Sequence, residues 1–223
     1  MVRRHQMLTV GVDGVAVERR LAAGGLSCPG CAGVLAGWGY ARERGVRGWE
    51  GAVRVCPRRS RCRGCGVTHV LLPVVVLLRR ADTAGVIGAA LVAKVAGAGY
   101  RRIAVELGRP VETVRGWLRR FGARLEAVRR VFTVLVRSLG TDPVMPPPTG
   151  GRWGDAVGAI TAAAWAATVR FVMVVPPWAL AAVVSGGRLL APGWPPDAGN
   201  SGQQRATRVA PDGGWSRAVI FGA

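Results

Sequence analysis

The sequence predicts a mixed, mainly α fold, with a small cysteine-bearing β domain, an all-α domain built on two crossing helices, and a C-terminal helical segment. Three observations predict this order. Two Cys-x-x-Cys pairs accompany short segments rich in β-forming residues, at residues 34–40 and 52–56 between the pairs and at 67–72 after the second pair. A helical pattern then continues to a break rich in proline and glycine, and a second apolar stretch follows that break.

The cysteine pattern predicts a structural metal site. In the pairs Cys28-Pro-Gly-Cys31 and Cys62-Arg-Gly-Cys65, both thiolates of one turn can point at the same ion. Four sulfur ligands leave no open position, so we expect one structural zinc ion in a zinc ribbon, bound by Cys28, Cys31, Cys62 and Cys65. The 30 residues between the pairs exceed the common spacing and leave room for a β-hairpin extension holding Trp38, Tyr40 and the arginines of residues 42–61. The alternative to a zinc site is a set of free or redox-active thiols. His69 is an alternative ligand that could replace one cysteine. Cys56 is expected in the core.

The charge distribution favours a polyanionic partner. The chain has a formal net charge of +19, and residues 1–138 hold 25 basic and 8 acidic side chains. A field of that size attracts nucleic acid, although a solvated basic surface is an equal alternative on charge alone. The odd cysteine count and the lack of an apolar leader do not fit a secreted disulfide framework. We therefore expect a cytoplasmic, nucleoid-associated protein.

Residues 100–119 carry the pattern of a helix-turn-helix. Apolar residues stand where two crossing helices need contacts, at Ile103, Leu107, Val114 and Trp117. Ala104 is small where the helices approach, Gly108 suits a turn with positive φ, and Pro110 suits the first turn of the next helix. A support helix over residues 82–98, with Asp82 as its N-cap, precedes the motif. An ordinary helical hairpin is the alternative.

A helix-turn-helix would place its second helix, residues 111–121, in the major groove of DNA. The residues expected to face base edges are Val111, Glu112 and Arg115. Of these, Arg115 suits guanine O6 and N7, and Glu112 either accepts from cytosine N4 or pairs with a neighbouring arginine. The side chains expected at phosphates are Arg101, Arg102, Arg109, Arg119 and Arg120.

These patterns divide the chain into six segments. Residues 1–27 form an N-terminal strand and helix extension, residues 28–80 the zinc ribbon, and residues 81–140 the helix-turn-helix domain. Residues 141–152 are a linker, residues 153–192 an apolar helical segment, and residues 193–223 a disordered tail. The apolar run at 156–169 is shorter than the about 18–20 residues that span a bilayer, so we expect two buried helices, at 155–175 and 178–184, and no membrane partner.

A repeat of apolar residues in the last turns of the helix-turn-helix domain has two possible uses. Leucine, valine and phenylalanine recur at steps of three and four, at Leu125, Val128, Phe132, Leu135 and Leu139. These side chains pack in the core, or they form the seam of a homodimer.

Three segments resemble transposase-like zinc-ribbon/helix-turn-helix proteins of bacteria, the N-terminal part of insertion-sequence transposases. They are CRGCGVTHVLLP at 62–73, GYRRIA at 99–104 and TVRGWLRRF at 113–121. The resemblance covers residues 25–140 and implies DNA binding. In complete transposases a catalytic domain with three magnesium-binding carboxylates follows. Here the only acidic residues after residue 139 are Asp142, Asp155, Asp197 and Asp212.

The sequence thus indicates a non-enzymatic protein that binds double-stranded DNA sequence-specifically, as an accessory factor or a transcriptional regulator. The alternative function is an RNA- or ribosome-associated zinc-ribbon protein. No small-molecule site is evident.

Overall fold

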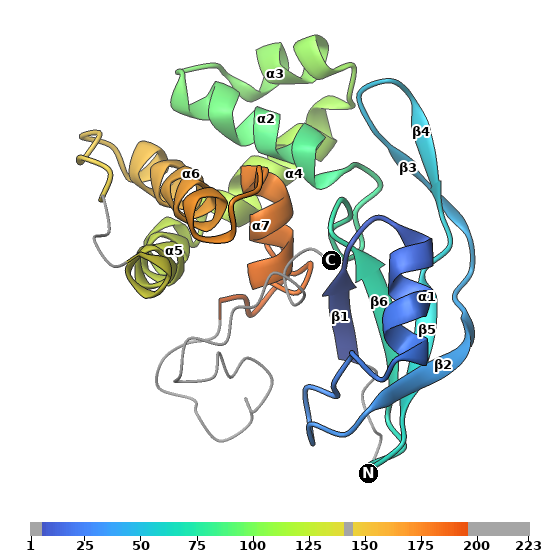
Figure 1. The fold of residues 1–223 in the computed structure, drawn as a ribbon. Helices are drawn as coiled ribbons and strands as arrows, with labels where there is room; N and C mark the ends of the chain where they lie inside the picture. The colour runs from blue at the N-terminus through green and yellow to red at the C-terminus, as the bar shows by residue number, and fades with distance from the viewer. Residues whose placement is uncertain (1–5, 141–144, 196–223) are drawn as a thin grey trace.

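The computed structural model describes residues 6–140 and 145–195. Strands from the first 80 residues lie on one side of the molecule, and helices from the later residues lie on the other (Figure 1). The two parts are in contact, since Thr9 Oγ1 donates to the Ala182 carbonyl at 3.4 Å and Leu78 N donates to the Gly187 carbonyl at 2.7 Å. The mixed, mainly α fold predicted from the sequence is confirmed.

The β part is built on a four-stranded sheet with the order β1-β6-β5-β2. Its strands are β1 (Gln6–Val10), β2 (Leu35–Tyr40), β5 (Arg58–Cys62) and β6 (Thr68–Pro73). β1 runs parallel to β6, while β6–β5 and β5–β2 are antiparallel. The short strand expected near the N-terminus is therefore part of this sheet.

One face of the sheet is covered by α1 (Gly14–Ala22), which begins where the Asp13 carboxylate accepts from Val15 N at 2.8 Å. Val17 and Leu21 of this helix pack with Leu35 of β2 and Leu71 of β6. In Figure 1 α1 lies in front of the strands.

A separate hairpin of β3 (Arg44–Arg47) and β4 (Ala52–Val55) extends from the sheet to the helices (Figure 1). Val46 and Val55 are buried against Leu72 and Val76 at its base. The hairpin expected between the two cysteine pairs is thus present. Trp38 and Tyr40 lie on β2 of the main sheet, however, and not on the hairpin where they were expected.

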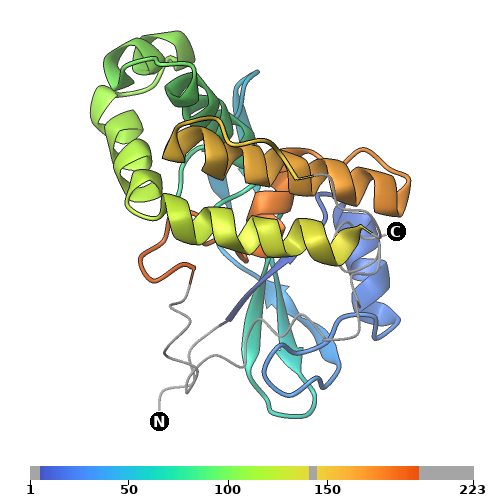
Figure 2. The same ribbon diagram turned by 90° about the vertical axis from the view of Figure 1, so that its left-hand side faces the viewer.

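The helical part has one continuous core. Its elements are α2 (Ala84–Val95), α3 (Tyr100–Leu107), α4 (Val111–Gly122), α5 (Leu125–Leu139), α6 (Arg152–Phe171) and α7 (Pro177–Val184). α5 and α6 lie side by side (Figure 2). The five repeating apolar residues of α5 are at most 5% exposed, which confirms core packing as their use.

The C-terminal helices match the predicted buried pair with shifted ends. α6 ends where Val172 adopts a left-handed φ of +52°, and α7 begins at Pro177. Gly88 of α2 allows the Trp178 ring to lie directly on its backbone, because a Cβ there would come within 2.1 Å of the ring. Over the described ranges, no helix is both long and apolar enough to cross a membrane.

The expected linker and tail are only partly covered by the described residues. Residues 141–144 of the linker and 196–223 of the tail lie outside them. The linker ends where Thr149 donates from both N and Oγ1 to Asp155 Oδ1 at 2.8 Å. Trp194 is only 7% exposed, and its carbonyl accepts from Arg124 at 2.6 Å, so the start of the expected disordered tail is packed against the core.

Candidate metal centre and nucleic-acid interface

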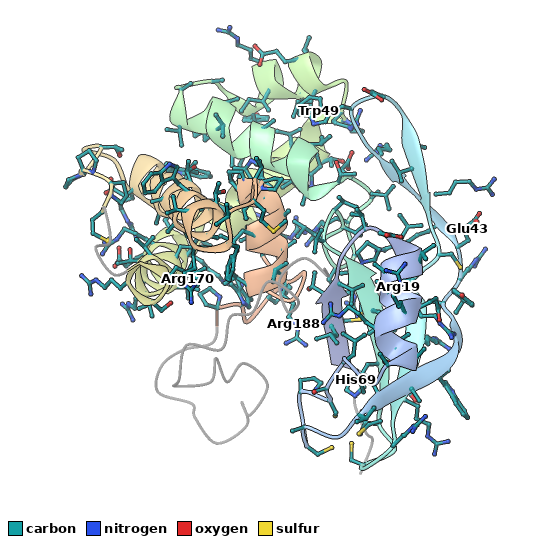
Figure 3. All side chains as sticks on the ribbon, in the orientation of Figure 1. Arg19, Glu43, Trp49, His69, Arg170 and Arg188 are labelled. Carbon is teal, nitrogen blue, oxygen red and sulfur yellow. The ribbon has the colours of Figure 1, made fainter. Side chains whose placement is uncertain are left out.

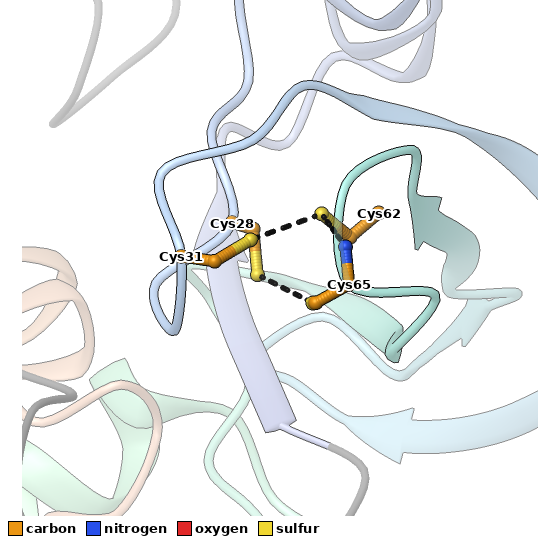
Figure 4. A group of neighbouring side chains, drawn as sticks. All are labelled: Cys28, Cys31, Cys62 and Cys65. Atoms are coloured by element: carbon orange, nitrogen blue, oxygen red, sulfur yellow. Dashed lines mark hydrogen bonds between the residues drawn. The ribbon is translucent and has the colours of Figure 1, made fainter.

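The four cysteines of the two Cys-x-x-Cys pairs come together at one end of the sheet (Figure 4). Their sulfur atoms all lie within 4.8 Å of one another, with Cys31–Cys62 at 3.4 Å and Cys28–Cys65 at 3.7 Å. A tetrahedral ion with metal–sulfur bonds of about 2.3 Å needs sulfurs about 3.8 Å apart. The cluster can therefore hold a metal ion, as the spacing predicts.

The two cysteine turns have the same backbone geometry. In the first, Ala32 N donates to the Cys28 carbonyl at 2.8 Å, and in the second, Gly66 N donates to the Cys62 carbonyl at 3.0 Å. Ala32 and Gly66 both have positive φ, at +59° and +70°. Because each turn directs two sulfurs to the same side, a pair of such turns builds a four-sulfur site.

Gly33 packs closely beside the sulfurs. A Cβ on Gly33 would lie 3.0 Å from Cys62 Sγ and 3.3 Å from Cys31 Sγ. A side chain there would crowd the two sulfurs, which would have to shift by a few tenths of an ångström to make room for it.

The thiols of Cys28 and Cys62 differ in acidity. Burial raises the pKa of Cys28 to about 12. The pKa of Cys62 is lowered to about 6, because the Cys65 N–H donates to the Cys62 sulfur. A metal ion binds thiolates, so loading the site releases protons. His69 is fully buried behind the cluster, and its Nε2 lies 3.4 Å from Cys28 Sγ, where it can orient that ligand rather than replace it.

Cys56 was expected in the core, but it is exposed and lies outside the cluster. Its thiol donates to the Ala41 carbonyl at 3.3 Å. The residue follows β4 at the end of the hairpin, where the strand leaves the core.

The tight bend between the two predicted crossing helices is present. α3 ends at Leu107, Gly108 adopts φ +60° and ψ 42°, and α4 starts at Val111 directly after Pro110. Ile103, Val114 and Trp117 are buried between the helices, and Leu107 packs at the edge of the same core. Ala104 is 2% exposed, which fits its role as the small residue at the crossing.

α4 has one buried and one exposed face. The core side carries Val114, Trp117, Leu118 and Phe121. The opposite side has a shallow depression lined by Glu112, Arg115, Gly116, Arg119 and Arg120. Arg115 lies 3.4 Å from Glu112, but their side chains are 61% and 76% exposed, so this ion pair contributes little stability and opens easily.

Tyr100 connects the two helices on this exposed side, which sequence reasoning did not anticipate. The guanidinium carbons of Arg101 and Arg115 lie 5.7 Å and 6.0 Å from the centre of its ring. These cation–π contacts hold one arginine of α3 and one of α4 near the same ring. Arg102 pairs with Glu106 on α3 and remains 77% exposed.

Arg109 was expected at a DNA phosphate, but its side chain is only 14% exposed and is used within the protein. Its Nε donates to Asp82 Oδ1 at 2.6 Å and its Nη2 donates to the Gly48 carbonyl at 2.9 Å. Arg109 is therefore removed from the set of phosphate contacts.

Asp82 was expected as the N-cap of the support helix, and this prediction is wrong. Thr83 caps α2, with its Oγ1 accepting from Val86 N at 3.5 Å. The Asp82 carboxylate is 2% exposed and accepts from Arg109 and, at 2.7 Å, from Arg47 of the hairpin. It thus joins the β3–β4 hairpin to the turn between α3 and α4. Figure 3 shows the hairpin tip, marked by Trp49, beside these helices.

Comparison of the chain with protein-family models, with curated proteins and with solved structures finds no match.

Proposed function

We propose that this protein binds double-stranded DNA in a sequence-specific manner, with α4 in the major groove. The observation that carries the proposal is the exposed side of α4, where Arg115, Arg119 and Arg120 surround a depression on a helix that follows a tight positive-φ bend. A helix buried on one side and basic on the other is the shape that enters a groove about 12 Å wide.

Individual roles follow from position and exposure. Arg115 is the base reader, because a guanidinium forms two parallel hydrogen bonds with guanine O6 and N7. Its pair with Glu112 is long and solvent-exposed, so DNA could displace it at little cost. Arg101 and Arg102 on α3, and Arg119 and Arg120 on α4, are exposed and serve as phosphate contacts that fix the register. Val111 is 38% exposed at the start of α4, and in this proposal it contacts a thymine methyl group.

The metal in this proposal is a single zinc ion with a structural role. Four thiolates suit zinc and leave no position for a substrate or a reactive water. The ion would stabilise the end of a β part whose own core is small. The resemblance to transposase-like proteins stays a prediction, and so does the choice between an accessory factor and a transcriptional regulator.

The test is selection of bound duplexes from a random pool with zinc-loaded protein, followed by measurement of variants on the recovered site. Arg115→Ala should cost about 1–3 kcal/mol at one base position and relax the preference there, whereas Arg102→Ala should weaken all duplexes alike and reduce the salt dependence. Arg170→Ala removes the same charge from α6 and is the matched control. Uniform losses from both Arg115→Ala and Arg102→Ala, or a pool that yields no motif, would contradict the proposal.

A further inference from the structure

The face of the ribbon sheet opposite α1 carries exposed basic and aromatic side chains. On β5, Ser60 and Cys62 are buried on the α1 side, so the alternating residues Arg59 and Arg61 point to the other side, and both are exposed. Across the ladder Arg61 is opposite Ala36, and two residues further along β2 stands Trp38. We call Trp38, Arg59 and Arg61, with the half-buried Ala36, Thr68 and Val70, the Trp38 face.

Trp38 is held at this surface without being buried. The Arg61 guanidinium carbon lies 4.8 Å from the centre of its ring, yet the residue remains 54% exposed. Gly37 and Gly39 flank it on an edge strand, and a Cβ on Gly39 would meet no atom within 4 Å. Since more than half of Trp38 is exposed, the indole is accessible to a flat ligand.

Among the described residues, no acidic side chain forms an ion pair with Arg59 or Arg61 of the Trp38 face. The four strands of this sheet contain no acidic residue. Glu18 is nearby, but it pairs with Arg58 at 2.5 Å on the α1 side. Glu43, the next acidic residue along the chain after Glu18, pairs with Arg54 at 2.6 Å. The arginines at 59 and 61 therefore present a positive surface beside an exposed indole.

We propose that the Trp38 face binds single-stranded nucleic acid, with an unpaired base stacked on Trp38 and the backbone phosphates against Arg59 and Arg61. Arginines beside an exposed aromatic ring are the usual means of binding unpaired bases, because every base has a flat surface and every nucleotide a negative charge. This site is separate from the duplex-reading helix and does not rest on it.

A duplex fits this face poorly. Its bases are already stacked on one another, so Trp38 would meet only their edges. The geometry thus favours unpaired bases over paired ones.

The test measures the fluorescence anisotropy of labelled dT15, U15 and a 15-base-pair duplex with full-length, zinc-loaded protein at about 0.15 M salt. Trp38→Ala should weaken single-strand binding about 5- to 150-fold, the loss of one stacked base, and leave duplex binding unchanged. Trp38→Phe should retain most of the affinity. Trp165→Ala, which removes a tryptophan that is 59% exposed on α6, should have no effect.

Several outcomes are informative. Tighter binding of dT15 identifies single-stranded DNA as the ligand, tighter binding of U15 identifies single-stranded RNA, and either supports the proposal. Equal losses of single-strand and duplex binding in Trp38→Ala, a loss below twofold, or equally effective competition by polyglutamate would overturn it. Arg115→Ala, measured in the same assay with a 15-base-pair duplex that carries the selected site, separates the two proposals, since it should weaken only the duplex. Unchanged zinc content and circular dichroism show that the variants are folded.

Discussion

Replacing Asp82 with asparagine tests the junction between the β part and the helical part. The Asp82 carboxylate is 2% exposed and is the shared partner of two arginines, at 2.6 Å from Arg109 and 2.7 Å from Arg47. Asparagine keeps the size and one acceptor oxygen but removes the charge and turns an N–H₂ group toward a guanidinium. Arg109, 14% exposed, then lacks a counter-charge in a site that water hardly reaches.

The expected cost follows from burial. Breaking a buried ion pair by removing one partner costs about 3–5 kcal/mol, because the remaining charge stays desolvated. Two features place Asp82→Asn near the lower limit. Arg47 is 41% exposed and can turn to water, and Arg109 still donates to the carbonyls of Leu107 and Gly48. We expect a loss of about 3 kcal/mol, or about 6–12 °C in Tm for a chain of this size.

Urea and thermal unfolding of zinc-loaded protein at neutral pH, followed by circular dichroism, would measure this loss. The matched control is Glu106→Gln, whose partner Arg102 is 77% exposed, so the change should stay within about 0.5 kcal/mol. A double variant with Arg109→Gln should lose less than the sum of the two single losses, because both remove one interaction. If Asp82→Asn destabilised the protein no more than the control does, the buried junction would not exist as described.

Three further predictions concern the metal, the helix packing and pH. The protein should contain about one zinc ion per chain by atomic emission, Cys62→Ala should abolish it, and Cys56→Ala should not, because Cys56 lies outside the cluster. Gly88→Ala should lower the free energy of unfolding by about 1–3 kcal/mol or more, because the new Cβ clashes with Trp178. Gly85→Ala on the same helix meets only Trp49 Nε1, at 3.6 Å, and should raise it by about 0.5–1 kcal/mol. Urea titrations would measure both changes. The Thr149 N–H holds the pKa of Asp155 below its usual value. This carboxylate therefore contributes stability above about pH 4, and that stability is lost as the pH falls through the lowered pKa. Asp155→Ala should remove this part of the acid dependence of unfolding.

The metal cluster and the bend at Gly108 were predictable because both depend on short stretches of chain. Two thiols separated by two residues share one turn wherever they occur, and a glycine followed by Pro110 ends one helix and begins the next through local backbone geometry. The apolar spacing also assigned Val114 and Trp117 to the core, since a helix places residues three and four apart on the same side.

Contacts between distant residues were not predictable in this way. Asp82 meets Arg47 and Arg109, which are 35 and 27 residues away, and nothing in its immediate sequence distinguishes it from an N-cap. Arg109 lies among exposed arginines of the same motif, so its burial follows only from the position of the hairpin. The parallel pairing of β1 with β6 joins segments about sixty residues apart, beyond the reach of any periodicity.

The side of the sheet on which Trp38 lies could not be predicted from the sequence. The sequence placed Trp38 in a β segment, but a shift of one residue in register moves a side chain to the other side of a sheet. The bulge between Gly37 and Tyr40 changes which residues share a face near the end of β2. Tyr40 consequently reaches Glu18 of α1, while Trp38 meets Arg61 on the opposite side.

The chain between the two cysteine pairs connects the metal cluster to the turn that precedes α4. Cys31 and Cys62 limit this segment, and their sulfurs lie 3.4 Å apart, so a bound ion closes it into a loop. The tip of that loop is the β3–β4 hairpin, and Arg47 near its tip contacts the carboxylate that also holds Arg109 in the turn before α4. Because a closed loop has fewer unfolded conformations to lose than an open one, metal binding favours the state in which the hairpin supports that turn.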